Sequence, residues 1–339
     1  MEPIDPDTLS VEEKKRALGA VNIIEQKRDG RIKARTCANG SKQRMYLKED
    51  ESVASPTVSL EGLLAATVIG AYERRKFISF DIPGAFLQAE LGDDKMMLLK
   101  LRGEKMVELM CEVNEEHRKN VRIENGQTVL YMKVIRTLYG CIEAALNWYI
   151  LFTQTLEKIG FTLNPYDKCI GNKIINGHQC TIAWHVDDCI VSHVEQKVLD
   201  DIAKLMIKEF GEMEISRGED HSFLGMNFNI KDGYVEIEMK KQINNLITEF
   251  EMKTGERLDE TVTSIANHDL FVVREEVDQL GKEKSNIFHS TTQKLLYIMK
   301  RARPDLETAV SFLMRRVSKS DLDDWDKLNR VLGFFEKNN

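Results

Sequence analysis

The sequence predicts an α+β fold in which helices back an antiparallel sheet. Two observations favour this class: segments of strand periodicity alternate with segments of helical periodicity, and the central strands come in hairpins joined by short turns. A chain of 339 residues can bury a sizeable core, and its length predicts two or three subdomains. Hydrophobic residues at 42% and charged residues at 30% place the chain among ordinary soluble globular proteins.

Caps, turns and periodicity predict where the elements begin and end. Ser10 and Glu13 have the spacing of a capping box, and Asp29-Gly30 is a hairpin signal. Pro304 and Asp321 suit the first positions of the last helices. In chain order, we expect a helix at 10–18, strands within 21–35, a buried helix at 60–72, a polar loop at 112–126, a strand at 128–134, an amphipathic helix at 142–159, a helix at 194–210, a hairpin at 223–239 and mainly helices after 240.

Two adjacent aspartates, Asp187 and Asp188, lie at the tip of a predicted hairpin within 183–191. Carboxylates in such a place stay solvated, lie close together and repel each other, so they make a poor core but a good seat for hard divalent cations. Taken alone, an Asp-Asp pair is more often an ordinary solvated turn. A third carboxylate elsewhere in the chain makes the metal hypothesis stronger.

That third carboxylate is Asp81, at the end of an apolar strand at 77–82. Because side chains alternate along a strand, the apolar even-numbered residues share one face, and Asp81 points to the other face with Ser79. Pro83-Gly84 then ends the strand, since proline cannot donate to the ladder. Three aspartates from two strands could hold two Mg²⁺ ions about 3.5–4 Å apart, an arrangement that supports phosphoryl transfer.

A basic segment precedes these carboxylates. The net charge of −7 argues mildly against a nucleic-acid-binding protein, but the distribution of charge matters more than the total. Such a run is more often just a solvated face, and beside a carboxylate triad it also suits phosphate contacts. Residues 26–48 contain one acidic residue, Asp29. Their basic residues are Lys27, Arg28, Arg31, Lys33, Arg35, Lys42, Arg44 and Lys48.

The sequence offers no sign of a membrane or secretory protein. No apolar run approaches the roughly 18–20 residues that a membrane helix needs, and the first residues lack a signal-peptide pattern. The six cysteines form no Cys-x-x-Cys pair, which favours reduced thiols. We therefore expect an intracellular protein, cytoplasmic or nuclear, with no membrane partner.

A series of motifs runs in order over residues 20–335. They are Arg31–Arg35 with Gly40 and Lys42-Gln43, Asp81–Leu87, Leu138–Gly140 with Trp148-Tyr149, Val186–Asp188, Phe223–Gly225, Leu296-Tyr297, and Arg303–Leu306 with Ala309-Val310. Together they resemble the reverse transcriptase of copia-type LTR retrotransposons, an RNA-directed DNA polymerase. A series in order is far more specific than any one of its motifs.

The resemblance implies a right-hand polymerase. We expect an N-terminal helical arm at 1–21, fingers at 22–135 that include the first palm strand near 76–91, a palm at 136–232 and a helical thumb or connection at 233–339. The family places its RNase H domain after the segment that resembles 303–335, so we expect that domain to be absent here.

The resemblance also implies a role for each motif residue. Asp81, Asp187 and Asp188 would be catalytic and would hold two Mg²⁺ ions, for which Mn²⁺ could substitute, with the backbone carbonyl of Ile82 as a further ligand. The implied nucleotide-binding residues are Lys33, Arg35, Phe86, Tyr139 and Gly140, and the implied primer grip is Leu224, Gly225 and Met226. The implied partners are an RNA or DNA template with its primer, dNTPs and other products of the same element.

Several residues, and the function itself, have more than one interpretation. Phe86 is either a core residue or the aromatic that lies under the incoming sugar. Trp148, Tyr149 and Phe152 fit a core-facing stripe rather than a platform for stacking bases. The family pattern is broken at 141–146, including Ile142 and Glu143, and at His185, where the family usually has tyrosine. A degenerate relic that only binds nucleic acid or a partner is one alternative function, and a metal-dependent nuclease is another.

Overall fold

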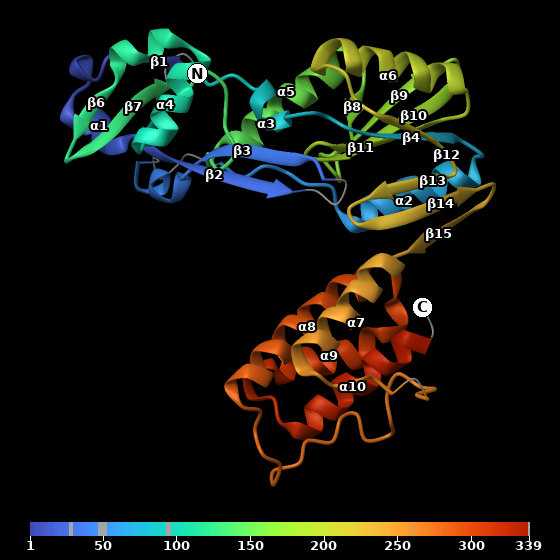
Figure 1. The fold of residues 1–339 in the computed structure, drawn as a ribbon. Coiled ribbons are helices and arrows are strands. Elements are labelled where there is room, and N and C mark those ends of the chain that lie inside the picture. The colour runs from blue at the N-terminus through green and yellow to red at the C-terminus, as the bar shows by residue number, and fades with distance from the viewer. Residues whose placement is uncertain (27–29, 47–52, 93–95, 260, 338–339) are drawn as a thin grey trace. The chain divides into compact units, whose positions relative to one another are not determined.

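The structure is a computed structural model, and it describes residues 1–26, 30–46, 53–92, 96–259 and 261–337 (Figure 1). The chain divides into two compact units. The first unit comprises Met1–Ala66 and Phe77–Ser216, and the second comprises Thr67–Lys76 and Arg217–Asn339.

The first unit contains a sheet formed by the N-terminal segments. Its strands are β1 (Glu2–Pro3), β2 (Leu18–Gln26), β3 (Ile32–Ala38), β5 (Leu98–Arg102), β6 (Arg122–Glu124) and β7 (Gln127–Lys133). The order is β1-β7-β5-β2-β3, with β6 paired to β7, and the β2–β5 pair is parallel. Helix α1 (Val11–Arg16) precedes β2, and α4 (Glu104–Val113) buries Val107 and Cys111 against this sheet.

A second sheet holds the central hairpins. Its order is β12-β4-β11-β10-β9-β8, and β11 pairs antiparallel with β10 and β10 with β9. The strands are β4 (Lys76–Asp81), β8 (Thr162–Leu163), β9 (Ile170–Ile175), β10 (His178–His185), β11 (Asp188–His193) and β12 (Ile215–Gly218). The short helix α3 (Ala85–Gln88) follows β4, and α2 (Leu60–Tyr72) precedes it.

Two long helices, α5 (Ala144–Lys158) and α6 (Gln196–Phe210), lie beside the strands β8 to β11 (Figure 1). Four buried aromatic rings join them to the sheet. The ring of Phe152 on α5 lies 5.3 Å from that of Trp184 on β10 and 5.8 Å from that of Phe210 on α6. Trp148, also on α5, lies 5.3 Å from Phe210. Burying four large aromatic side chains supplies much of the hydrophobic stabilisation of this sheet.

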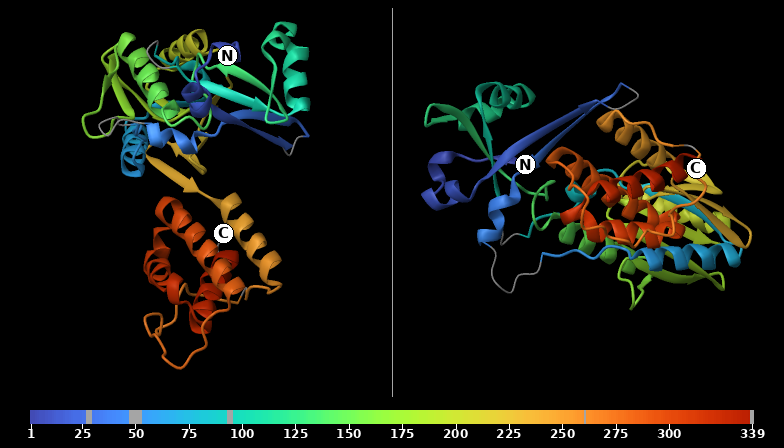
Figure 2. Two further views of the ribbon diagram at one scale, coloured as in Figure 1. Left: turned by 90° about the vertical axis from the view of Figure 1, so that its left-hand side faces the viewer. Right: turned by 90° about the horizontal axis from the view of Figure 1, so that it is seen from below.

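The second unit combines a small sheet with a group of C-terminal helices. Strands β13 (Asp220–Phe223), β14 (Met226–Lys231) and β15 (Tyr234–Glu238) form an antiparallel sheet in that order. The helices are α7 (Lys240–Thr254), α8 (Lys282–Ala302), α9 (Glu307–Arg316) and α10 (Leu322–Lys337), which pack side by side (Figure 2). Phe250, Phe288 and Phe335 are fully buried in this unit.

The predicted α+β class, with an antiparallel sheet backed by helices, is confirmed. The capping box between Ser10 and Glu13 is formed, with both reciprocal hydrogen bonds present. The helix predicted at 60–72 has those bounds, and Asp321 directly precedes α10. A turn was predicted at Asp29-Gly30, and Asp29 lies outside the described residues. Strands β2 and β3, before and after that position, pair antiparallel.

Three local predictions were wrong. The hairpin predicted at 223–239 begins later than expected, because β13 ends at Phe223 and β14 begins at Met226, which leaves Leu224 and Gly225 in a turn. Helix α2 is apolar yet not buried all round, because Val68, Ile69 and Tyr72 are 53%, 49% and 79% exposed. The segment 112–126 is not a simple loop, since it includes the end of α4, a 3₁₀ turn at Glu115–Asn120 and strand β6. Charged residues dominate that stretch, so its sequence shows no clear periodicity for these short elements. Contacts with neighbouring elements stabilise them instead. No helix of the described residues is long and apolar enough to cross a membrane.

Candidate active site

The turn between β10 and β11 carries the aspartate pair. His185 lies opposite Asp188 in the hairpin, so Val186 and Asp187 form a two-residue turn. Val186 has φ +59°, which is uncommon for a β-branched residue and, at the first turn position, typical of a type II′ turn. Strained residues of this kind persist where the surroundings hold them, and they cluster at functional sites.

Trp148 supplies the support for this turn. Its indole Nε1 donates a hydrogen bond of 2.7 Å to the carbonyl oxygen of Val186. The stripe of Trp148, Tyr149 and Phe152 was predicted to be packing, and Trp148 and Phe152 are indeed buried. Tyr149 is only half-buried, and its hydroxyl donates a hydrogen bond of 3.2 Å to the carbonyl oxygen of Lys168. The hydrogen bond to the aspartate turn was not foreseen, because no sequence pattern links a helix indole to a turn so far along the chain.

Asp81 reaches the same place from β4, the strand next to β11 in the sheet. The backbone N–H of Ile82 donates a hydrogen bond of 2.9 Å to the carbonyl oxygen of Asp187. Strand β4 is buried from Phe77 to Phe80, including Ser79, so both of its faces are covered before it opens at Asp81. The three aspartates predicted from two strands therefore meet.

The three carboxyl groups act on one another electrostatically. Partial burial, the charges of Asp187 and Asp188 and a hydrogen bond to the Asp187 carboxyl raise the pKa of Asp81 to about 6, against the opposing charge of Lys33. Burial and the charge of Asp187 also raise the pKa of Asp188. Within the described residues, no three His, Cys, Asp or Glu side chains form a ready-made metal centre. The site therefore concentrates negative charge on oxygen donors.

The basic strand β3 faces this acidic site. The charge of Lys33 acts on Asp81, and the guanidinium of Arg35 lies 5.6 Å from the centroid of the Tyr139 ring. Tyr139 in turn has its pKa raised by burial and by the charge of Asp187, while Arg35 opposes that shift. Since Lys33 and Arg35 are two residues apart, they project from the same face of the strand. The structure thus places Lys33 where its charge acts on Asp81, and Arg35 beside the ring of Tyr139.

A close backbone crossing fixes β3 to the loop of Tyr139 and Gly140. The N–H of Ala38 donates a hydrogen bond of 2.7 Å to the carbonyl oxygen of Tyr139. Gly140 has φ +88°, and a Cβ there would lie 2.1 Å from the carbonyl oxygen of Ala38. A Cβ on Gly40 would lie 2.1 Å from the carbonyl oxygen of Gly140. Only glycine therefore fits at either position.

Phe86 lies on α3, just after the left-handed turn at Gly84. Its ring centroid is 5.2 Å from that of Tyr139, with the planes inclined at 59°. The side chain is half-buried and packs against the core cluster that includes Leu138. Phe86 therefore contributes to core packing and also lies beside the ring of Tyr139, whose pKa is raised by the charge of Asp187.

The predicted grip residues lie in the second unit, at the turn between β13 and β14. Phe223 pairs with Met226, and Leu224 and Gly225 form the turn with φ +49° and +74°. Two successive positive φ values are typical of a type I′ turn. The side chain of Met226 is fully buried, so only its backbone is available to a ligand.

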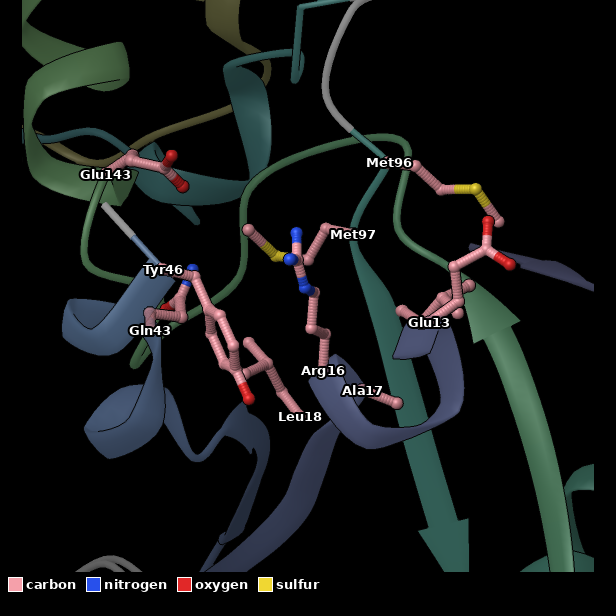
Figure 3. A pocket seen from close by; sticks show the side chains of 10 residues that line it. Glu13, Arg16, Ala17, Leu18, Gln43, Tyr46, Met96, Met97 and Glu143 are labelled. Atoms are coloured by element: carbon pink, nitrogen blue, oxygen red, sulfur yellow. The ribbon is translucent and has the colours of Figure 1, made fainter. Parts of the chain in front are cut away.

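A cavity of about 420 Å³ lies near the segment where the motif pattern is broken. Figure 3 shows Arg16 between Tyr46 and Met97 at this cavity, with Glu143 on another side. The guanidinium of Arg16 is 4.9 Å from the Tyr46 ring centroid. Beside Glu143, the N–H of Ile142 donates a 3.0 Å hydrogen bond to Gln43 Oε1. Sequence reasoning missed this cavity because its lining comes from distant segments.

An antiparallel sheet that presents clustered carboxylates beside a basic strand defines a class of protein able to bind hard cations and phosphates. The comparison with family models is specific. This chain belongs to the reverse transcriptase (RNA-dependent DNA polymerase) family, whose model matches residues 8–263. The resemblance inferred from the ordered motifs is thereby confirmed.

Transposon proteins are among the relatives. The chain is 21% identical over 332 residues to the Retrovirus-related Pol polyprotein from transposon TNT 1-94 of Nicotiana tabacum, covering 94% of this chain and 23% of the polyprotein. It is 25% identical over 199 residues to a transposon Ty5-1 protein of Saccharomyces cerevisiae, covering 58% of this chain and 62% of that protein. The chain thus spans less than two thirds of either relative.

The chain also has a distant similarity to solved structures of protein–nucleic acid complexes. One is a foamy viral protease-reverse transcriptase in complex with double-stranded DNA, with a TM-score of 0.41 and 13% identity over 88% of this chain and 43% of that chain. Another is telomerase from Candida albicans in complex with a fragment of telomeric RNA, with a TM-score of 0.35 and 10% identity over 98% of this chain and 62% of that chain.

Proposed function

We propose that this chain is an RNA-directed DNA polymerase that adds dNTPs to a primer 3′-hydroxyl and releases pyrophosphate. The observation that carries the proposal is the meeting of Asp81, Asp187 and Asp188 beside the basic strand β3. Family membership supports this class of reaction. The proposal extends it to this chain's own site residues and their roles.

The donor set fits divalent cations. The groups at the site are carboxylate oxygens, and Mg²⁺ and Mn²⁺ prefer such oxygen ligands. The backbone carbonyl of Ile82 would be a further ligand. Asp81 and Asp187 would hold both ions, and Asp188 would serve the ion nearest the primer hydroxyl. When bound, two ions supply Lewis-acid activation of the attacking oxygen and charge neutralisation at the leaving oxygen.

Other residues would position the nucleotide. Lys33 and Arg35 present their charges on the face of β3 that acts on Asp81 and Tyr139, where they would hold the triphosphate and offset charge in the transition state. Tyr139 and Gly140 would contact the nucleotide from the loop. Phe86, beside Tyr139, would lie under its sugar.

The partners follow from this reaction. A template with its primer would bind mainly through its backbone and shape, because base pairing supplies the sequence information. In this proposal, the expected fingers at 22–135 carry β3, the palm at 136–232 carries the aspartate turn, and the helical thumb lies within 233–339. Leu224 and Gly225, with the backbone of Met226, would contact the primer strand.

Primer extension tests the proposal. The protein is incubated with a labelled DNA primer on an RNA template, dNTPs and Mg²⁺, and the product lengths are resolved on a gel. Extension by single-nucleotide steps is the expected result. A shortened primer would indicate a nuclease instead, and binding without any change of length would indicate a relic that has lost turnover.

A further inference from the structure

The turn of the grip hairpin is tied to two helices of the same unit. Tyr297 on α8 donates a hydrogen bond of 2.8 Å from its hydroxyl to the carbonyl oxygen of Leu224. Gln242 on α7 donates from Nε2 to the carbonyl oxygen of Gly225. Both carbonyl oxygens of the turn therefore have side-chain donors, which fixes the orientation of the turn relative to α7 and α8.

The fit between this turn and α8 is close. A Cβ at Gly225 would lie 2.8 Å from the hydroxyl oxygen of Tyr297, so a larger residue would push the tyrosine away. Gly225 also has φ +74°, which only glycine adopts easily. The turn and Tyr297 thus form one rigid junction.

Arg301 places a positive charge beside this junction. It lies one helical turn after Tyr297, and its guanidinium carbon is 3.7 Å from the centroid of the Tyr297 ring. Among the described residues, no carboxylate forms an ion pair with Arg301, and its buried Nε has no hydrogen-bond partner. Arg303, two residues on, differs because it pairs with Asp305 at 2.8 Å. Arg303 is therefore structural, whereas Arg301 has the Tyr297 ring and a 3.4 Å hydrogen bond from its Nη1 to the carbonyl oxygen of Tyr297 as contacts, and no carboxylate partner among the described residues.

We propose that Arg301 contacts a backbone phosphate of the primer strand, and that Tyr297 and Gln242 are the positioning residues that hold the grip turn beside it. The inference rests on the proposed function for the role of the hairpin. A guanidinium held over an aromatic ring, as that of Arg301 is at 3.7 Å from the Tyr297 centroid, is pre-organised, and its planar set of N–H donors matches the oxygens of a phosphate. The exposed Lys300 next to it adds to the positive charge.

The first test measures the affinity for a primed duplex by fluorescence anisotropy at several salt concentrations, without dNTPs. Arg301→Ala is expected to weaken binding about tenfold, as loss of a charge-assisted hydrogen bond does, and to reduce the salt slope by about 0.9. Arg301→Lys should restore most of the slope. The control Arg315→Ala, which removes an exposed cation from the last turn of α9, should change neither.

The second test addresses the positioning residues. Tyr297→Phe keeps the ring under Arg301 and removes the hydroxyl that donates to Leu224. We expect the KM for primed template to rise several-fold while the KM for dNTP and the salt slope stay unchanged, and Gln242→Leu should act in the same direction. A merely structural role would instead lower the melting temperature and leave the two KM values in their original ratio.

The outcomes separate this inference from the proposed function. Duplex binding requires no turnover, so the Arg301 result stands even if the wild-type protein extends no primer, in which case only the proposed function fails. If Arg301→Ala retains its fold by thermal melting and binds duplex with the affinity and salt slope of the wild type, the phosphate contact is wrong. Equal primed-template KM values for Tyr297→Phe and wild type would overturn the positioning role.

Discussion

The indole nitrogen of Trp148 donates a 2.7 Å hydrogen bond to the carbonyl oxygen of Val186, and so a buried helix residue holds the strained turn that presents Asp187. The turn cannot relax without breaking that bond. Through Val186, packing under the sheet is therefore linked to the position of the proposed catalytic carboxylates.

Trp148→Phe should weaken both the fold and the reaction. Trp184 provides a matched control, because it is equally buried and its indole makes no hydrogen bond within the described residues. Both substitutions remove similar volume, so the extra loss in Trp148→Phe, about 1–2 kcal/mol by urea denaturation, measures the hydrogen bond. Primer extension should fall more in Trp148→Phe than in Trp184→Phe. Equal losses in the two variants would show that the bond does not support the turn.

Gly140→Ala should lose more stability than the strain of an alanine in a left-handed conformation alone explains. Its new Cβ would meet the carbonyl oxygen of Ala38, whereas a Cβ at Gly126, with φ +75°, meets nothing within 4 Å. Gly126→Ala should therefore show only the strain of a left-handed residue, about 1–2 kcal/mol. Gly140→Ala should lose clearly more stability and most of its extension activity. Similar melting temperatures for the two variants would contradict the close crossing.

Phe86→Val tests whether this residue excludes ribonucleotides. If the ring lies under the incoming sugar, it leaves no room for a 2′-hydroxyl, and overpacking of about 1–3 kcal/mol corresponds to a roughly ten- to hundredfold bias. The variant should keep much of its dNTP activity and gain rNTP incorporation by one or more orders of magnitude. Should Phe86 act only in the core, the melting temperature would fall and the dNTP-to-rNTP ratio would stay the same.

Mg²⁺ should stabilise the protein even without substrate. An ion that binds only the folded state adds about 1.4 kcal/mol at ten times its Kd, which raises the melting temperature. In Asp188→Asn this increase should shrink, because one of the carboxylates that meet at the site is lost. An unchanged response to Mg²⁺ would mean that the ions bind elsewhere. NaCl at matched ionic strength with the wild type offers a check for general ionic effects.

Much of the aspartate site could be predicted from the sequence, because local patterns carry it. Asp81 ends its strand as the alternation indicates, and Asp187 and Asp188 lie at a hairpin tip. Their convergence depends on β4 and β11 being neighbours in one sheet. The sequence offered the meeting of the three aspartates only as a hypothesis, since no local pattern reports which distant strands pair.

The features that sequence reasoning missed are long-range or strained. The bond from Tyr297 to Leu224 joins residues 73 positions apart, and no periodicity signals it. The positive φ of Val186 runs against the preference of a β-branched residue, so local propensity would have excluded it. Both are cases in which tertiary contacts override local preference.

The central claim is that the three aspartates carry out nucleotide addition, and Asp187→Asn tests it most directly. The exchange is nearly isosteric, so the melting temperature should change little, but it deletes a charge that the proposed metal ions share. Losing metal-organised phosphoryl transfer should cost several kcal/mol of barrier, a loss of about a thousandfold or more in rate. Asp232→Asn, at an exposed hairpin turn, is the matched control and should extend primers normally. The measurement is the single-nucleotide extension rate in matched Mg²⁺: we predict loss of extension in Asp187→Asn alone, and rates equal to the wild type in both variants would contradict the account.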